Sequence, residues 1–151
     1  MKGMSLDQMD YKIIGALTED SRKPLRELAN ELGIPFSTLY SKIKRLENMK
    51  IITKYVAVCD YSRLGYALTA ITEITVSKGK LVEIEKKVAV MNNVISVYDV
   101  TGESDIMIVT KFRTPEELSA FTKKLLSLEY VERTYTHVVL NIIKEDLKMN
   151  I

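Results

Sequence analysis

Residues 24–47 read PLRELANELGIPFSTLYSKIKRLE, and their pattern predicts two consecutive helices. Each half repeats apolar residues at helical spacing, which gives each helix one side to bury: Leu25, Leu28, Ala29 and Leu32 in the first, and Leu39, Ile43 and Leu46 in the second. Pro24 suits the first turn of a helix. Gly33 follows the first apolar stripe, where a glycine readily takes a positive φ. We therefore expect two helices joined by a tight turn, the second running from about Pro35 to Asn48.

The side of the second helix opposite its apolar stripe is polar and basic. Small hydroxyls come first and cations follow one to two turns later: Ser37, Thr38, Ser41, Lys44 and Arg45, with Tyr40 and Lys42 at the flanks. Hydroxyls and backbone N–H groups at a helix N-terminus can approach phosphates or base edges closely. Residues 36–54 hold five Lys or Arg against one acid, a local charge of +4, whereas the whole chain carries +2. Such a stripe suits contact with a polyanion, although a solvated helix face gives the same pattern.

A further helix is expected before these two, because apolar residues share one helical side: Leu6, Ile13, Ile14 and Leu17. A tight glycine turn followed by a helix with an exposed polar and basic side is typical of a helix-turn-helix. We therefore expect residues 1–53 to form a helix-turn-helix domain that binds double-stranded DNA. Its expected contact residues are Arg22, Ser37, Thr38, Tyr40, Ser41, Lys42, Lys44 and Arg45. The alternative is a helical hairpin with a polar surface.

Several segments resemble the N-terminal half of the leucine-responsive/AsnC (Lrp/AsnC, feast/famine) transcriptional regulators. The resemblance rests on LDQMDYKIIGAL, SRKPLRELANELGI, STLYSKIKRLE and IITKYVAVCDYSRLGY. It implies a winged helix-turn-helix and a role in transcription regulation. Two positions depart from the family: Pro35 stands where a serine usually caps the helix, and Lys50 stands where glycine is usual. Because the second position is expected to need a positive φ, a lysine there carries a conformational cost.

The rest of the chain predicts an α+β fold for the second domain. Residues 54–60, KYVAVCD, are rich in β-formers and are expected to form a strand, within a linker spanning 54–65. Residues 66–151 then follow the order strand, helix, strand, strand, helix, strand, which is ferredoxin-like. The expected elements are strands 66–76, 94–100, 105–112 and 131–144, and helices 79–91 and 114–128. Thr114, Pro115 and Glu117 mark the second helix start by an N-cap, a proline at N1 and a capping box.

Helices on one face of an antiparallel sheet leave its other face bare. Apolar side chains on a bare face need a cover, so we expect two copies to pack sheet against sheet in a homodimer. The Lrp/AsnC resemblance extends over residues 66–144. It implies an effector-binding and oligomerisation domain in which dimers assemble further, to a tetramer or octamer.

The loop VTGESD, residues 100–105, is typical of a hairpin turn between two strands. The resemblance implies a second role, because the family binds an amino acid where this Gly-x-x-Asp turn lies. Gly102 could offer backbone N–H groups to an α-carboxylate, and Asp105 could accept an α-ammonium group. The expected effector-binding residues are Tyr98, Val100, Thr101, Gly102, Glu103, Ser104, Asp105, Thr134 and Thr136. The alternative is a plain turn beside ordinary strand residues.

Composition excludes several other classes of protein. One Cys and one His rule out a disulfide framework within one chain and argue against a His/Cys metal site. No apolar run reaches the roughly 18 residues of a membrane helix, and the first residues lack the apolar core of a signal peptide. We therefore expect a cytoplasmic protein without a metal or a cofactor, apart from an amino acid effector. No nucleophile–base pair or phosphate loop indicates catalysis, so an enzyme built on the ferredoxin-like domain is the least favoured interpretation. The main competing function is an architectural protein that wraps DNA without an effector.

Overall fold

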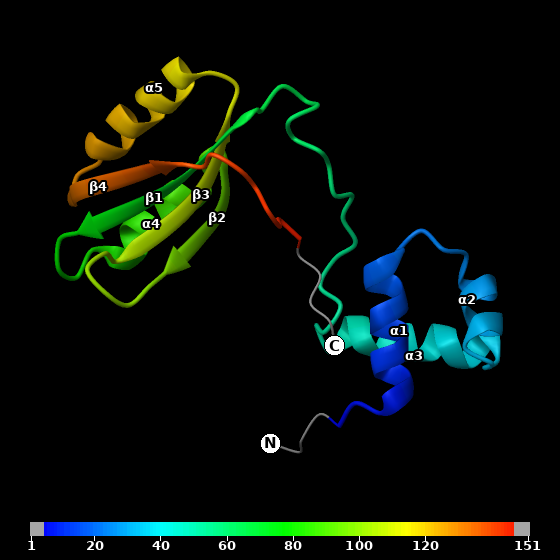
Figure 1. Cartoon of the computed structure of the whole chain (residues 1–151). Coiled ribbons are helices and arrows are strands. Elements are labelled where there is room, and N and C mark those ends of the chain that lie inside the picture. Colours follow the sequence, from blue (N-terminus) through cyan, green and yellow to red (C-terminus); the bar gives the residue numbers. More distant parts are fainter. Residues whose placement is uncertain (1–4, 147–151) are drawn as a thin grey trace. The chain divides into compact units, whose positions relative to one another are not determined.

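The computed structural model describes residues 5–146, and its elements run α1, α2, α3, β1, α4, β2, β3, α5 and β4 (Figure 1). The chain divides into two compact units. One unit contains residues 5–58 together with residues 144–146, and the other unit is Cys59–Ile143. None of the described helices combines the length and the apolar character that a membrane crossing requires.

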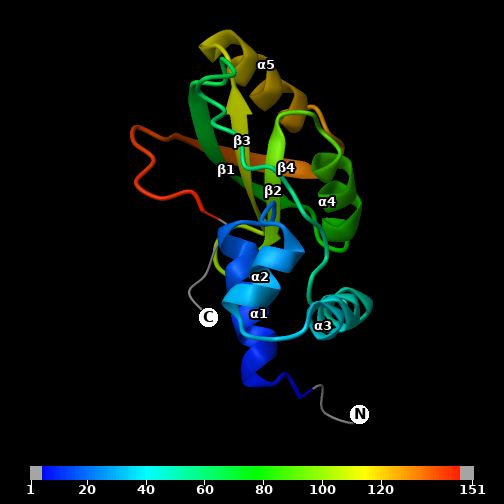
Figure 2. The same cartoon turned by 90° about the vertical axis from the view of Figure 1, so that its right-hand side faces the viewer.

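The first unit is built from α1 (Gln8–Glu19), α2 (Leu25–Glu31) and α3 (Phe36–Asn48). Figure 2 views α3 nearly end-on, with α1 and α2 beside it. The predicted apolar stripes meet in one core, whose buried members are Ile13, Leu17, Leu28, Ala29, Leu39, Ile43 and Leu46. The expected three-helix arrangement is confirmed, and the helix periodicity located its core correctly.

Backbone conformations at the helix ends agree with two of the sequence expectations. Gly33 has φ +65° and ends α2, while Lys50 has φ +59° just beyond α3. A lysine therefore occupies the left-handed conformation that was expected to favour glycine. Pro24 and Pro35 are the residues immediately before α2 and α3, and neither supplies a side-chain cap. The prolines thus lie one position earlier than the first helical turn.

The strand predicted over residues 54–60 is wrong for the single chain, because this segment has no regular structure between α3 and β1 (Leu68–Val76). All of its residues are exposed. A strand needs a neighbouring strand to satisfy its backbone N–H and C=O groups. β-propensity alone does not supply that neighbour.

The second unit has the expected βαββαβ order. β1 is followed by α4 (Leu81–Ala89), β2 (Val94–Asp99), β3 (Ile106–Phe112), α5 (Pro115–Leu126) and β4 (Val131–Val138). The sheet order is β2-β3-β1-β4, and every neighbouring pair is antiparallel. This is the ferredoxin-like topology that the sequence predicted.

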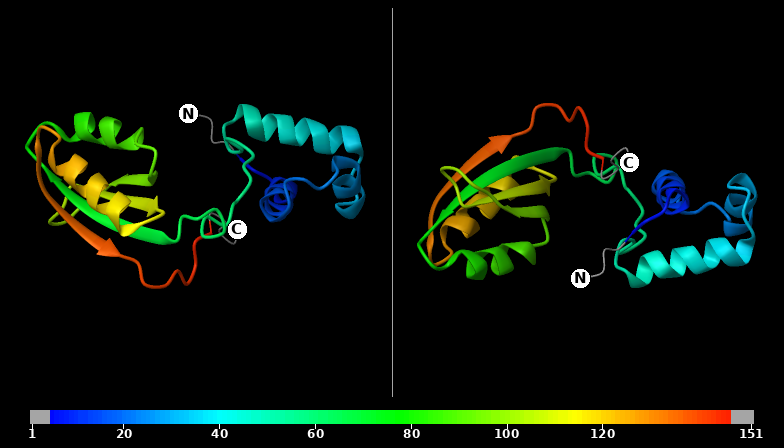
Figure 3. Two further views of the ribbon diagram at one scale, coloured as in Figure 1. Left: turned by 90° about the horizontal axis from the view of Figure 1, so that it is seen from above. Right: turned by 90° about the horizontal axis from the view of Figure 1, so that it is seen from below.

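Both helices of this unit cover the same face of the sheet, as Figure 3 shows. The core between them is formed by Ala70, Ile74, Val76, Ile84, Val88, Ile106, Ile108, Phe112, Phe121 and Leu125. Alternate residues point to the other face. On that open face, Ile71 of β1 is paired with Val109 and His137, and Glu73 is paired with Met107 and Tyr135. The bare face predicted from topology therefore exists in the single chain.

Two details of the expected elements differ. β4 ends at Val138 instead of continuing to residue 144, because its pairing with β1 stops close to the first residue of that strand, Leu68. The last bond joins the Val139 N–H to the Thr69 carbonyl oxygen at 2.9 Å. At α5, Thr114 accepts from the Glu117 N–H, but the Glu117 carboxylate accepts from the N–H of Arg113. In the predicted capping box, the Glu117 carboxylate would accept the N–H of Thr114, so the observed bond lies one residue earlier in the chain.

Candidate nucleic-acid interface and effector loop

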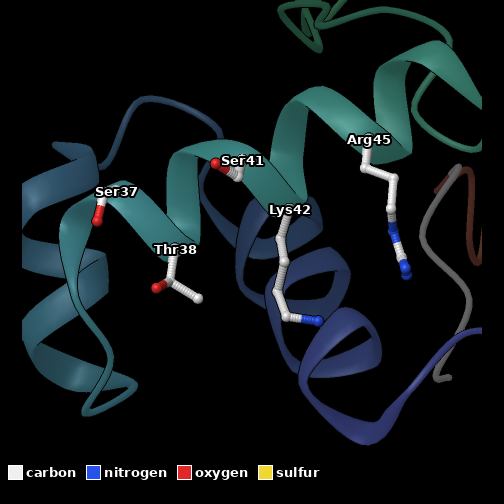
Figure 4. A pocket seen from close by; sticks show the side chains of 5 residues that line it. All are labelled: Ser37, Thr38, Ser41, Lys42 and Arg45. Atoms are coloured by element: carbon white, nitrogen blue, oxygen red, sulfur yellow. The ribbon is translucent and has the colours of Figure 1, made fainter.

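The outer side of α3 carries seven of the eight predicted DNA-contact residues. Five of them line an open hollow of about 360 Å³ on this helix: Ser37, Thr38, Ser41, Lys42 and Arg45 (Figure 4). The three hydroxyl side chains lie over the first turns of α3 and are exposed. Because these side chains are small, another molecule can approach the backbone of the N-terminal part of α3 closely.

The two cations of this hollow extend toward α1, as Figure 4 shows. The Lys42 ammonium lies 3.0 Å from one carboxylate oxygen of Asp10, and Arg45 Nη2 donates to the other. Lys42 also donates to Asp7. The hydrogen bond between Lys42 and Asp7 is the main reason that the pKa of Lys42 is raised and that of Asp7 is lowered.

Asp10 is the centre of this ion cluster and its side chain is completely buried. Asp7 and Asp10 also form a capping box at the start of α1, because each carboxylate accepts the backbone N–H of the other residue. One buried carboxylate therefore serves both the helix start and the two cations of α3. No role for Asp10 was expected from the sequence. The Asp-x-x-Asp spacing, which allows reciprocal capping, was the signal that could have identified it.

The remaining predicted DNA-contact residues lie apart from the hollow. Lys44 is bonded to Glu47 at 2.7 Å, and its ammonium lies 5.7 Å from the centre of the Tyr40 ring. Arg22 lies in the turn between α1 and α2, where its backbone N–H donates to Asp20. Arg22 is exposed, but the structure does not bring it into the α3 hollow.

The second candidate site is the loop between β2 and β3. Gly102 has φ +131°, a conformation that favours glycine. The Val100 N–H donates to the Asp105 carbonyl oxygen at 3.0 Å, which closes the loop. The Asp105 carboxylate accepts the N–H of Val76 at 2.8 Å. Asp105 therefore fastens the loop to the end of β1, a structural role that belongs to the plain-turn alternative.

The predicted effector residues do not all lie on one side of the sheet. Tyr98 pairs with Met107 and so lies on the open face, half exposed. Thr134 and Thr136 pair with Ile74 and Thr72, so they lie on the helix-covered face. The Thr136 hydroxyl is 3.0 Å from the Thr72 hydroxyl. Thr134 and Thr136 lie on the same face of the sheet, as the alternation of side chains along a strand predicts. Tyr98 lies on the opposite, open face.

The open face beside the loop contains a hollow of about 310 Å³. It is lined by Glu73, Thr75, Glu103, Ser104, Arg133 and Tyr135. Glu73 accepts from the Ser104 hydroxyl at 2.7 Å and lies 3.0 Å from Nε2 of His137. These two contacts lower the pKa of Glu73 below its ordinary value of 4.5, and the Ser104 hydrogen bond is the larger cause. The hollow thus presents both acidic groups and a guanidinium, a combination suited to a zwitterion.

Comparison with known proteins assigns a class to these two domains. Residues 6–53 match the winged helix-turn-helix DNA-binding domain, and residues 69–149 match the Lrp/AsnC ligand binding domain. The chain is therefore a transcriptional regulator with a DNA-binding domain and a ligand-binding domain, in a class of proteins that are not enzymes. It belongs to the Lrp/AsnC family.

Relatives and solved structures agree over nearly the full length. An uncharacterized HTH-type transcriptional regulator of Pyrococcus furiosus is 44% identical over 146 residues, covering 97% of this chain and 99% of that protein. The regulator FL11 of the same organism is 36% identical and covers 99% of this chain and 98% of its own. The structure of LrpC from B. subtilis has a TM-score of 0.85 at 28% identity, over 93% of this chain and 99% of that one. A transcriptional regulator from Neisseria meningitidis, solved as an L-Met complex, has a TM-score of 0.90 at 26% identity, over 97% of both chains.

Proposed function

We propose that this protein regulates transcription by binding particular DNA sequences through α3, and that an amino acid modulates its DNA affinity or its assembly. The observation that carries the first part is the outer side of α3. Exposed hydroxyls lie near its N-terminus, and cations follow toward its C-terminus. Such a helix can enter the major groove and read base edges, while cations contact phosphates.

The proposal includes a homodimer, formed when the open sheet faces of two copies cover each other. Ile71, Met107 and Val109 are only partly buried on that face. Covering them removes apolar surface from water. A two-fold dimer carries two α3 helices and suits a roughly symmetric DNA site. Further association to a tetramer or octamer is part of this proposal and would bring additional DNA-binding domains together.

An amino acid is the proposed effector for two reasons. The related Neisseria regulator was solved with L-Met. The loop 100–105 and the hollow beside it offer groups of both charges, including Glu73 and Arg133. The proposal requires no cofactor or metal ion.

A mobility-shift assay tests this function directly. The full-length protein is titrated onto the DNA upstream of its own gene and onto random DNA of equal length. The assay is repeated with each of the twenty amino acids. Preference for the upstream DNA, changed by one amino acid or a few, is the expected result. Equal binding to both DNAs would favour an architectural, DNA-wrapping protein, and specific binding unaffected by every amino acid would remove the effector.

A further inference from the structure

An exposed aromatic pair lies on α3 beside the hydroxyl-lined hollow. Phe36 and Tyr40 are one helical turn apart, with ring centres separated by 6.2 Å and ring planes inclined by 27°. They are 45% and 47% exposed. The other two phenylalanines of the chain, Phe112 and Phe121, are buried in the core of the second unit. Aromatic rings usually stabilise a protein by being buried, and this pair does not make that contribution.

Cations stand at both ends of this pair. The Arg26 guanidinium of α2 lies 5.9 Å from the centre of the Phe36 ring. The Lys44 ammonium lies 5.7 Å from the centre of the Tyr40 ring. The surface therefore runs from the Arg26 cation of α2 over the two rings of α3 to the Lys44 cation, which also pairs with Glu47. Its chemistry matches a partner that is apolar at the centre and negatively charged on both sides.

Thymine in the major groove of DNA has this character. Its C5-methyl group is the apolar feature of the groove, and phosphates border the groove on both sides. Phe36 is the first residue of α3 and directly precedes Ser37. The N-terminal residues of a recognition helix are those that reach base edges. A phenyl ring at this position can contact a methyl group but cannot form a hydrogen bond with a base.

We propose that Phe36 is a specificity-determining residue that selects thymine through its C5-methyl group. In this arrangement Tyr40 is a positioning residue that packs against the Phe36 ring, and Arg26 and Lys44 contact the flanking phosphates. The inference rests on the proposed DNA-binding function and adds the base that one side chain recognises.

The test removes the methyl group without changing the hydrogen-bonding edge of the base. A preferred site is first selected from random DNA with the full-length protein. Each thymine of that site is then replaced singly by deoxyuridine, and binding is measured by fluorescence anisotropy. Burial of one methyl group corresponds to about fourfold in affinity. We expect about a fourfold reduction in affinity for the wild-type protein at one thymine in each half-site.

The same probes are then measured with variants. Phe36→Ala should bind the thymine and deoxyuridine probes equally at that position, while Phe36→Leu should retain part of the discrimination. Tyr11→Ala is the matched control, because Tyr11 is an aromatic residue of α1 that is also 47% exposed. That variant should discriminate as the wild type does. Circular dichroism melting verifies that each variant is folded.

The outcomes separate the inference from the function on which it depends. If the selection yields no preferred site, both are overturned. If a preferred site exists but Phe36→Ala retains the full sensitivity to deoxyuridine, only the thymine contact is overturned. If Phe36→Ala also dissociates the oligomer in sedimentation experiments and leaves the sensitivity unchanged, the aromatic pair is a protein–protein contact instead.

Discussion

The buried carboxylate of Asp10 on α1 accepts a hydrogen bond from the guanidinium of Arg45 on α3. This pair links the first helix of the DNA-binding domain to the helix proposed to enter the major groove. Because Asp10 is completely buried and Arg45 is 46% exposed, the cation remains partly available while its direction is fixed. The same carboxylate also holds Lys42.

The first prediction concerns the stability of the helical domain. Asp10→Asn keeps the side-chain shape but removes the charge that Lys42 and Arg45 share. Breaking a buried ion cluster in this way should lower the free energy of unfolding by about 2–4 kcal/mol, measured by urea denaturation followed by circular dichroism. Glu31→Gln removes the exposed ion pair with Lys23 and serves as the control, with little change expected. An unchanged midpoint for Asp10→Asn would contradict the structural role of the cluster.

The second prediction is a pH effect at Asp7. The Lys42 ammonium donates to this carboxyl group and holds its pKa below the ordinary value of 3.8. Because the folded pKa is the lower one, the interaction stabilises the fold above pH 3.8, and this contribution disappears as the pH falls through the lowered value. NMR titration of the Asp7 carboxyl carbon should show the shift. Lys42→Met should return the pKa most of the way toward 3.8, whereas Lys23→Met should leave it in place.

The third prediction concerns the salt dependence of DNA binding. If Arg45 binds a phosphate, Arg45→Ala should weaken binding and reduce the slope of log K against log salt by about 0.9 for each phosphate that is no longer neutralised. Anisotropy titrations at several salt concentrations measure both quantities. Lys86→Ala changes an exposed cation on α4, in the other unit, and should change neither. A variant of Arg45 with wild-type affinity and slope would remove this residue from the interface.

The fourth prediction separates two roles of Asp105. Asp105→Asn retains an oxygen that can accept the Val76 N–H but lacks the charge needed for an ammonium group. We expect nearly wild-type stability with an abolished amino acid response in the mobility shift. Asp105→Ala should abolish the response and also lower the free energy of unfolding by about 1–2 kcal/mol. A full amino acid response in the Asn variant would show that the Asp105 charge does not bind the effector.

The fifth prediction concerns assembly through the open sheet face. Val109 lies on that face, paired with Ile71, so Val109→Lys should place a charge in the proposed dimer interface. Sedimentation equilibrium should then report a shift toward monomer. Val82→Lys alters a 58% exposed valine on α4 and should leave the assembly unchanged. Dimers of normal strength in Val109→Lys would exclude this face as the interface.

The sequence predicted those features that depend on local pattern. Helical spacing located the buried residues of α3, and Lys50 was expected to have a positive φ because the Lrp/AsnC family usually has glycine at its position. The order of strands and helices in the second unit followed from the apolar pattern of each segment and from the helix start at Thr114 and Pro115. These features need no knowledge of distant residues.

The features that the sequence missed depend on pairing between distant segments. Thr134 and Thr136 were correctly placed on one side of their strand, but only the register with β1 determines that this side faces the helices. The strand expected over 54–60 does not form in the single chain, because its composition does not provide a neighbouring strand. The ion cluster joins Asp10 to Lys42 and Arg45, which are 32 and 35 positions away, and no local pattern reveals it.

The segment between Asn48 and Leu68 has a consequence for the architecture of the promoters that this protein can serve. Ile51 and Ile52 pack against the core of the first unit, and residues 61–66 form a hydrogen-bonded turn. The residues between them, 53–60, span at most about 26–29 Å in one chain, so two such tethers together exceed one turn of B-DNA, about 34 Å. In the proposed dimer, two DNA-binding domains joined by such tethers need not match a single rigid spacing. Operators whose half-site spacings differ by one helical turn can therefore be bound by the same regulator.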